Sequence, residues 1–231
     1  MTFKSIPYTP VTKRLQDMEI ALVTTTGIHL SHQRPFYYDA DDPDTSFRVI
    51  PGSVDVQHLN VSHFAPANEF NVRPIQMDIN TVFPIERLRE LAQQQLIKKV
   101  APVHYAFMGY IYRLKKMSEA LPEFLTMLNF FTPDAIVLTA GCPYSHRTAV
   151  LIQRAIESQG IPTVLITIDL IKTQNYRPPR CIYPVHLQRK TPLGAPHHVE
   201  EQTRILKSAL HQLTLPQEPG QIIKIYPKQQ S

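Results

Sequence analysis

Cys142 is the residue whose type and position point most directly to chemistry. It lies in a polar turn between Gly141 and Pro143, after an apolar run and before a segment of helical length. That pattern places it where a strand ends and a helix begins. The free N–H groups and the positive dipole end of a helix favour a thiolate over a thiol. We therefore predict a reactive thiolate at Cys142, against the alternative that it is a small buried hydrophobe.

Two polar residues follow Cys142 at the start of the predicted helix. Ser145 can cap the helix or donate a hydrogen bond to the thiolate. His146 can tune the same thiolate or act as a general acid. Cys142, Ser145 and His146 are therefore the candidate catalytic residues.

The stretch around Cys142 reads as one βαβ unit. Apolar runs over 135–138 and 163–168 flank a helical segment that ends near Ser158, before Gly160.

The remaining chain repeats the alternation of strands and helices. A buried strand is predicted over 19–25, and amphipathic helices over 84–96, 117–130 and 199–213. This order predicts an α/β fold with a mainly parallel, open, doubly wound sheet of the flavodoxin or Rossmann type, covered by helices on both faces.

The predicted domain organisation is simple. Residues 19–213 form a single compact domain, preceded by a lead-in at 1–18 and followed by a C-terminal arm at 214–231 with one apolar patch at 222–226.

Polar turns after the predicted strands supply candidate substrate-binding residues, because ligands of open α/β sheets bind at the carboxyl ends of the strands. The candidates are Thr25, Thr26, His29, His63, Asp78, Asn80 and His104. The first three follow the first strand, and the others would supply polar contacts or proton transfer. The histidines lack the spacing of a metal site, so no metal is predicted.

The composition argues against nucleic-acid binding and against a membrane-spanning protein. The net charge is +5, but the basic residues are scattered along the sequence and no nucleic-acid-binding motif is present. We therefore predict that these residues are solvated surface charges, with some arginines facing the substrate, and that the protein does not bind nucleic acid. No apolar run is long enough to cross a membrane, and the N-terminus has no apolar leader segment. Two cysteines in 231 residues form no disulfide framework, so we expect a cytoplasmic location.

Two features leave alternatives open. C-P-Y-S at 142–145 is also a glutaredoxin-like string, so thiol–disulfide exchange is a rival chemistry, although the motif lies far from the N-terminus and no T-V-P loop follows. Cys181, in an apolar run, is either a core residue or a resolving partner for Cys142.

At these residues the sequence resembles the glycine/sarcosine/betaine reductase component B and D-proline reductase family. The stretch L-T-A-G-C-P-Y-S-H-R-T-A-V is similar to that family's selenocysteine segment. Other similar pieces are T-T-T-G-I-H-L, S-F-R-V-I-P, D-I-N-T-V-F-P-I-E-R-L-R-E-L, H-Y-A-F-M-G-Y and T-P-L-G-A-P. Laid against the family, Cys142 falls on the selenocysteine position, and Ser145 falls where glycine reductase has a cysteine.

The resemblance implies an oxidoreductase that cleaves an activated carbon–heteroatom bond, typically C–N, in a small amino-acid-like or amine substrate. Formally, such enzymes act on X–H and Y–H to form an X–Y bond with a disulfide as acceptor. The resemblance also implies a separate pyruvoyl-bearing subunit and a thiol or selenol electron-donor protein. No cofactor is predicted on this chain itself, and we expect a homo-oligomer.

The chain departs from the family pattern at two positions. Sulfur replaces selenium at Cys142, and Ser145 prevents an internal selenenyl sulfide. The alternatives are an easier substrate, such as a thioether, an organic thiol or a quaternary amine, and a non-catalytic ligand-binding subunit with a degenerate site.

Overall fold

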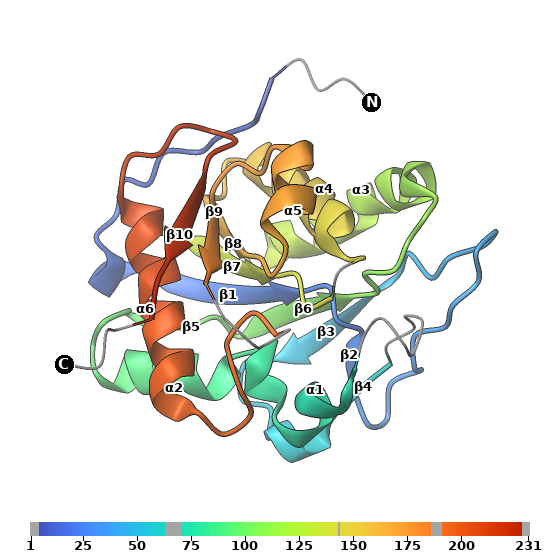
Figure 1. Cartoon of the computed structure of the whole chain (residues 1–231), viewed down its shortest axis with the longest axis horizontal. Helices are drawn as coiled ribbons and strands as arrows, with labels where there is room; N and C mark the ends of the chain where they lie inside the picture. The colour runs from blue at the N-terminus through green and yellow to red at the C-terminus, as the bar shows by residue number, and fades with distance from the viewer. Residues whose placement is uncertain (1–4, 63–70, 143, 186–190, 228–231) are drawn as a thin grey trace.

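The computed structural model describes residues 5–62, 71–142, 144–185 and 191–227. Its main sheet is eight-stranded, with the order β10-β9-β8-β7-β1-β6-β3 and with β5 paired to β1 (Figure 1). The strands of this sheet are β1 (Glu19–Thr24), β3 (Phe47–Pro51), β5 (Lys99–Val100), β6 (Val103–Phe107), β7 (Ala135–Thr139), β8 (Thr163–Ile166), β9 (Cys181–Pro184) and β10 (Ile222–Ile225). A separate antiparallel pair consists of β2 (Ile28–Leu30) and β4 (Leu59–Val61).

The helices connect these strands. The α-helices are α1 (Arg73–Met77), α2 (Ile85–Gln93), α3 (Leu114–Phe130), α4 (His146–Glu157), α5 (Leu170–Tyr176) and α6 (Val199–Thr214). Three short 3-10 turns are η1 (Leu15–Asp17), η2 (Val56–His58) and η3 (Ile79–Thr81). Among the described residues, no helix combines the length and the apolar composition needed to cross a membrane.

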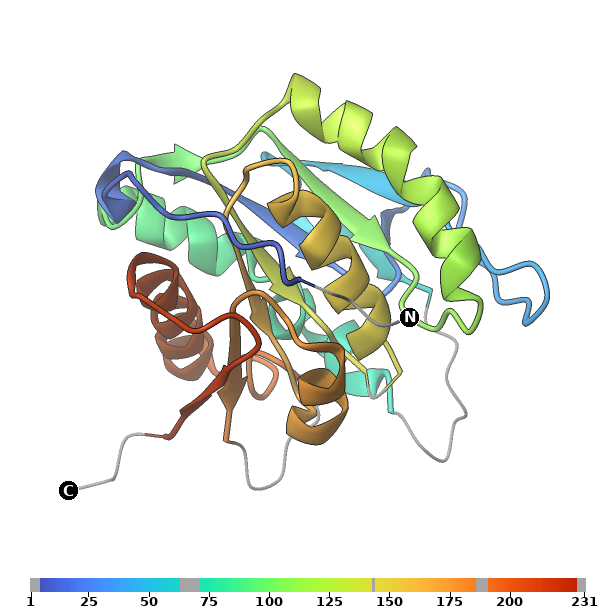
Figure 2. The ribbon, with the colours of Figure 1, turned by 90° about the horizontal axis from the view of Figure 1, so that it is seen from above.

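The central strands are apolar because both faces of the sheet are covered. Every residue of β7 is buried, as are the last five of β1, which is the pattern expected of parallel strands between two helical layers. Ile20 and Leu22 join the hydrophobic cluster with α2 and α6, whereas Ala21 and Val23 join the one with α3 and α4. Figure 2 shows these layers on opposite sides of the sheet. The predicted α/β fold is confirmed.

The strand order is that of a flavodoxin-like sheet with additions at both edges. β6, β1, β7, β8 and β9 lie side by side and run parallel. β3 is antiparallel to β6 at one edge, and β10 is parallel to β9 at the other. The apolar patch predicted in the C-terminal arm thus forms a strand of the main sheet.

The N-terminal lead-in lies against the far end of α4. Thr9 donates its N–H to the Glu157 carboxylate, and Arg180 donates to the Thr9 carbonyl. The Arg180 guanidinium lies 2.9 Å from the Glu157 carboxylate and 3.8 Å from the Tyr8 ring centroid. Both charged side chains are almost fully buried, so the lead-in covers a buried ion pair.

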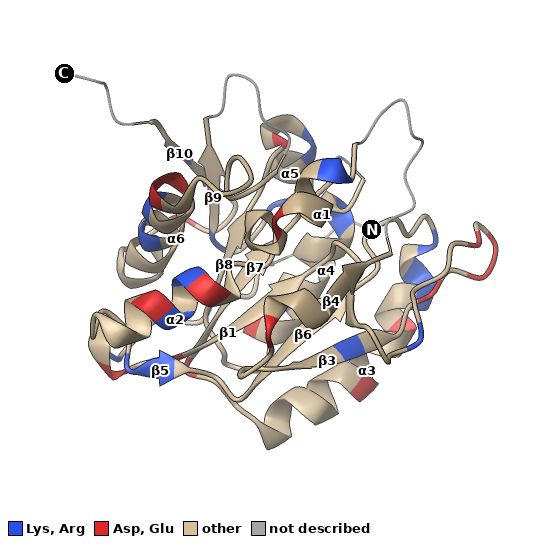
Figure 3. Ribbon diagram, turned by 90° about the horizontal axis from the view of Figure 1, so that it is seen from below, with Lys and Arg blue, Asp and Glu red and all other residues tan. Residues whose placement is uncertain are grey.

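Charges of both signs are interspersed over α2 and α6 on the face drawn in Figure 3. The net charge of the chain therefore does not gather into a basic stripe on this face.

Candidate active site

The carboxyl ends of β1 and β7 meet at the topological switch point of the sheet. The chain leaves β1 and returns through α2 on one face, whereas it leaves β7 through α4 on the other. A crevice opens where connections from adjacent parallel strands diverge in this way, and it is the usual ligand site of such sheets. Cys142 lies three residues beyond β7, at this point.

Threonine hydroxyls link the two strand ends. The Thr139 hydroxyl lies 2.8 Å from Thr24 Oγ1 and 2.5 Å from the Val82 carbonyl. Thr24 and Thr26 are joined by a 2.7 Å hydrogen bond, and the Thr25 hydroxyl lies 3.3 Å from the Thr139 carbonyl. Thr25 and Thr26 are fully buried, and neither lines the large cavity described below. The structure therefore places these two predicted substrate contacts in the framework of the site.

Two glycines allow the strand ends to approach. A side chain on Gly141 would overlap with Thr26, and one on Gly109 would overlap with Ser145 and the Thr25 carbonyl. The loop that carries Cys142 therefore packs directly against the end of β1.

The Cys142 thiol is fully buried and free. Burial raises its pKa to about 12, which outweighs the opposing effects of hydrogen bonds with Ser145 and of the Lys172 charge. The expectation of a depressed pKa was therefore wrong for this conformation, because desolvation disfavours a thiolate more than the nearby dipoles favour it.

Ser145 precedes α4 but makes no side-chain cap. Its hydroxyl donates to the Cys142 carbonyl at 3.0 Å and lies 3.2 Å from the Cys142 N–H. These two contacts close the turn on itself. The predicted helix cap is therefore absent, and the Ser145 hydroxyl instead fixes the backbone of the turn that carries Cys142.

His146 is the first residue of α4 and is almost fully buried. Its Nδ1 lies 2.8 Å from the Thr167 hydroxyl. Burial lowers the pKa of His146 to about 4, so the ring is neutral near pH 7.

A cavity of about 630 Å³ lies on the side of the sheet where β2, β4, α1 and η3 meet. Its polar lining includes three predicted substrate residues, namely His29, Asp78 and Asn80. Glu86 and His197 also line it. Cys142 does not line this cavity, although it shares a hydrophobic cluster with Ile79 of the cavity wall.

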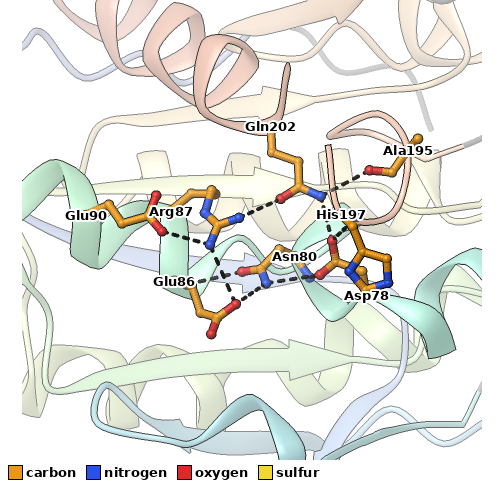
Figure 4. A network of polar contacts seen from close by, with 8 residues as sticks. All are labelled: Asp78, Asn80, Glu86, Arg87, Glu90, Ala195, His197 and Gln202. Atoms are coloured by element: carbon orange, nitrogen blue, oxygen red, sulfur yellow. Dashed lines mark hydrogen bonds and ion pairs between the residues drawn. The ribbon is translucent and has the colours of Figure 1, made fainter. Parts of the chain in front are cut away.

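Asp78 is the centre of a polar network in this wall (Figure 4). Its carboxylate accepts hydrogen bonds from the Asn80 N–H and side chain, at 2.9 and 3.0 Å. It also accepts bonds from the His197 N–H at 2.8 Å and from Gln202 at 2.7 Å. Burial by itself would raise the pKa of Asp78, but these bonds outweigh it and hold the pKa below its usual value. Asp78 is therefore a fixed carboxylate, and it forms no ion pair within the described part of the chain.

Two further residues of the cavity wall, Asn80 and His29, are also held by hydrogen bonds. The Asn80 side chain donates to Glu86 at 2.6 Å, which ties η3 to the first turn of α2. His29 uses both ring nitrogens, Nδ1 toward the Leu30 carbonyl and Nε2 toward the Ser62 hydroxyl, each at 2.9 Å.

His104 lies away from this site. The sequence predicted a turn at this position, but β6 continues through it, and the ring is fully buried. Its Nδ1 accepts the Leu22 N–H at 2.8 Å, and burial lowers its pKa to about 3. The prediction of a substrate contact was wrong, because the ring satisfies a donor of β1 where the ladder passes from β5 to β6. His63 lies outside the described residues.

Glu86, His197 and Gln202 are not among the predicted substrate-binding residues. T-P-L-G-A-P, one of the pieces similar to the family, directly precedes His197, but the contact of His197 with Asp78, 119 residues away in sequence, has no local signal. Across the described ranges, no three His, Cys, Asp or Glu side chains gather in a way that could hold a metal ion.

Cys181 cannot serve as a partner for Cys142 in this fold. It pairs with Leu165 of β8, which pairs with Leu138 of β7. Two strand spacings separate Cys181 from β7 by roughly 10 Å, with a further offset along the strands to Cys142. A disulfide requires Cα atoms within about 7 Å.

Comparison with known proteins identifies the family to which the chain belongs. No family model matches, and no solved structure matches. The chain is 38% identical over 223 residues to the D-proline reductase subunit gamma of Acetoanaerobium sticklandii, covering 94% of this chain and 87% of the relative. It is 25% identical over 224 residues to the glycine reductase complex component B subunit gamma of Symbiobacterium thermophilum, covering 93% of this chain and 50% of that relative. The resemblance noted in the sequence is confirmed, and the chain belongs to the family of these reductase γ subunits.

Proposed function

We propose that this protein is the nucleophile-bearing subunit of a reductase complex that cleaves a carbon–heteroatom bond in a small amine or amino acid. The position of Cys142 at the switch point of the sheet, beside the end of β1, is the observation that carries this proposal. The similarity to subunits of D-proline and glycine reductases supports the reaction class. We take D-proline and glycine as the first substrates to test.

The proposed reaction begins with ionisation of Cys142 after the loop has opened. The sulfur attacks the carbon and forms a C–S bond, while the C–N bond breaks and the amine leaves with the electron pair and takes up a proton. A second thiolate then attacks the sulfur, the C–S bond breaks, and the carbon takes up a proton. The product is a disulfide, which an external dithiol reduces. The substrate gains two electrons, and the thiols supply them.

The second thiol has to come from another molecule in this scheme, because Cys181 is too far from Cys142 and the chain has no other cysteine. A pyruvoyl group, in this proposal, belongs to a separate subunit that holds the substrate amine. The acidic cavity beside Asp78 and Glu86 suits a positively charged amine that approaches from this side.

The test is turnover by the assembled complex with Cys142→Ala. We expect loss of amine turnover, whereas Cys181→Ala, the matched control, should retain it. Mass spectrometry of the stalled wild-type complex should show substrate carbon attached to Cys142. Full turnover by Cys142→Ala would refute the proposal.

The burial of Cys142 favours one second candidate, a non-catalytic subunit with a degenerate site. Under that alternative, Cys142→Ala would bind the same small molecules and support the same turnover as the wild type. Reduction of a disulfide probe with glutathione, without substrate cleavage, would instead indicate thiol–disulfide exchange.

A further inference from the structure

A smaller pocket, of about 180 Å³, lies beside the start of α4. Tyrosine rings form much of its wall, among them Tyr112 and Tyr144. His146, Arg147 and Lys172 complete the part of the wall that is relevant here. None of these five residues lines the larger cavity beside Asp78, so the two are separate.

The positive end of α4 borders this pocket. The helix has 12 residues, no acidic side chain in its first turn and no side-chain cap from Ser145. The Ser145 hydroxyl is instead bonded to the Cys142 carbonyl. The positive dipole end is therefore not neutralised by these side chains, and such an end attracts anions.

Two cations flank the same pocket. The Arg147 guanidinium lies 5.5 Å from the Tyr112 ring centroid and donates to the Ile111 carbonyl at 2.8 Å. Arg147 forms no ion pair with any residue in the described ranges. The Lys172 ammonium lies 5.5 Å from the Tyr144 ring centroid and 3.4 Å from Asp169. Asp169 offsets part of this positive charge, and no acidic side chain is among the described residues that line the pocket.

His146 adds an unsatisfied polar atom to the wall. Its ring is 1% exposed, and its Nε2 has no hydrogen-bond partner within the described structure. The Thr173 and Thr167 hydroxyls lie 2.6 Å apart, and Thr167 lies 2.8 Å from His146 Nδ1. The Thr167 hydroxyl also lies 3.5 Å from the Asp169 carbonyl, a longer contact than the one to Nδ1. We assign its hydrogen to the shorter contact, so that Thr173 donates to Thr167, Thr167 donates to Nδ1, and the ring hydrogen is on Nε2, where it can donate to a ligand. Buried polar atoms are rarely left unpaired.

We propose that this pocket binds the oxyanion of a small ligand, a carboxylate or inorganic phosphate, through Arg147, Lys172 and the Nε2–H of His146. Arg147 offers a planar pair of donors, and Lys172 a point charge. The rings of Tyr112 and Tyr144 each lie 5.5 Å from one of the two cations and help to hold it at the pocket wall. The binding does not depend on reaction at Cys142, so it goes beyond the function proposed above.

The first test is calorimetric titration of the full chain with acetate and, separately, with inorganic phosphate. We expect at least one anion to bind, and the stronger one identifies the source of the oxyanion. Arg147→Gln and Lys172→Gln should each weaken binding about tenfold or more, which is about 1.4 kcal/mol. Lys115→Gln removes a charge at an 89% exposed position on α3 and should leave binding unchanged.

The second test needs no variant. Nitrogen-15 spectra of the imidazoles should show a shift of the His146 Nε2 signal when the bound anion is added. The proposal is overturned if neither anion binds, if both charge variants bind as tightly as the wild type, or if His146 Nε2 does not respond. Binding should persist in Cys142→Ala, so that failure of the proposed reaction and failure of this site are distinguishable.

Discussion

The reactivity of Cys142 toward an alkylating reagent tests the burial argument directly. Burial raises the pKa of Cys142 to about 12. Relative to an ordinary thiol with a pKa of about 8.5, this lowers the thiolate fraction near neutral pH by roughly a thousand-fold. Because the thiol is also inaccessible, we expect iodoacetamide to modify Cys142 of the isolated chain at least about a thousand times more slowly than a small exposed thiol.

The assay measures alkylation of the Cys142 peptide by mass spectrometry, as a function of pH. Cys181 is an internal control, since it is fully buried and burial raises its pKa well above the usual value. An alkylation rate that rises only above about pH 11 indicates that the thiol ionises while the loop still buries it. A midpoint near 8.5 with a strongly reduced plateau indicates reaction after the loop opens. Alkylation at pH 7.5 within tenfold of a free thiol would refute the reasoning.

Three further predictions concern groups around the sheet. Glu157→Gln leaves the Arg180 charge buried without its carboxylate and should destabilise the fold by about 3–5 kcal/mol in urea unfolding. His104→Leu removes the acceptor of the buried Leu22 N–H and should cost about 1–3 kcal/mol in the same assay. The folded-state pKa of Asp78 is depressed, so its carboxylate stabilises the fold above about pH 4, and this stability is lost as the pH falls through the lower folded value. Thermal unfolding should therefore show Asp78→Asn less stable than the wild type at pH 7, with the difference shrinking below about pH 4.

Each of these predictions has an outcome that would contradict it, and the first also has a control variant. Glu119→Gln breaks an exposed pair with Lys115 and should change stability by less than about 1 kcal/mol. Loss of equal size in both glutamate variants would contradict the ion-pair argument. An unchanged His104→Leu protein would mean that Leu22 finds another acceptor. A constant difference between Asp78→Asn and the wild type at all pH values would show that Asp78 acts through packing.

The sequence was a good guide where the signal is local. The βαβ unit around Cys142 was predicted because the apolar run at 135–138 and the amphipathic helix after it have clear periodicities. The helix at 199–213 was predicted within one residue for the same reason. Strands were missed where the sequence suggested turns. β2 is only three residues long, and β6 continues through His104 to Phe107.

The environment of the site was harder to predict, because it depends on residues that are distant in sequence. The helix start predicted a thiolate at Cys142. The thiol pKa depends instead on how deeply the loop is packed, and the packing at Gly109 and Gly141 has no local signature in the sequence. His29, Asp78 and Asn80 do come together in one cavity. His104 does not join them, since a histidine after a strand and a histidine within one look alike in sequence.

The central place of β1 has a consequence for how the protein folds. β1 is the first strand of the sheet in sequence, yet its partner β7 begins at Ala135, which pairs with Ile20. The N-terminal half alone therefore has its middle strand open on one edge, and contacts of such long sequence separation form slowly. The hydroxyl contact between Thr24 and Thr139 spans the same gap. Consequently the ligand crevice cannot exist in a nascent chain that lacks β7, and shortened forms ending before it are expected to be unfolded or prone to aggregate through the exposed edge of β1.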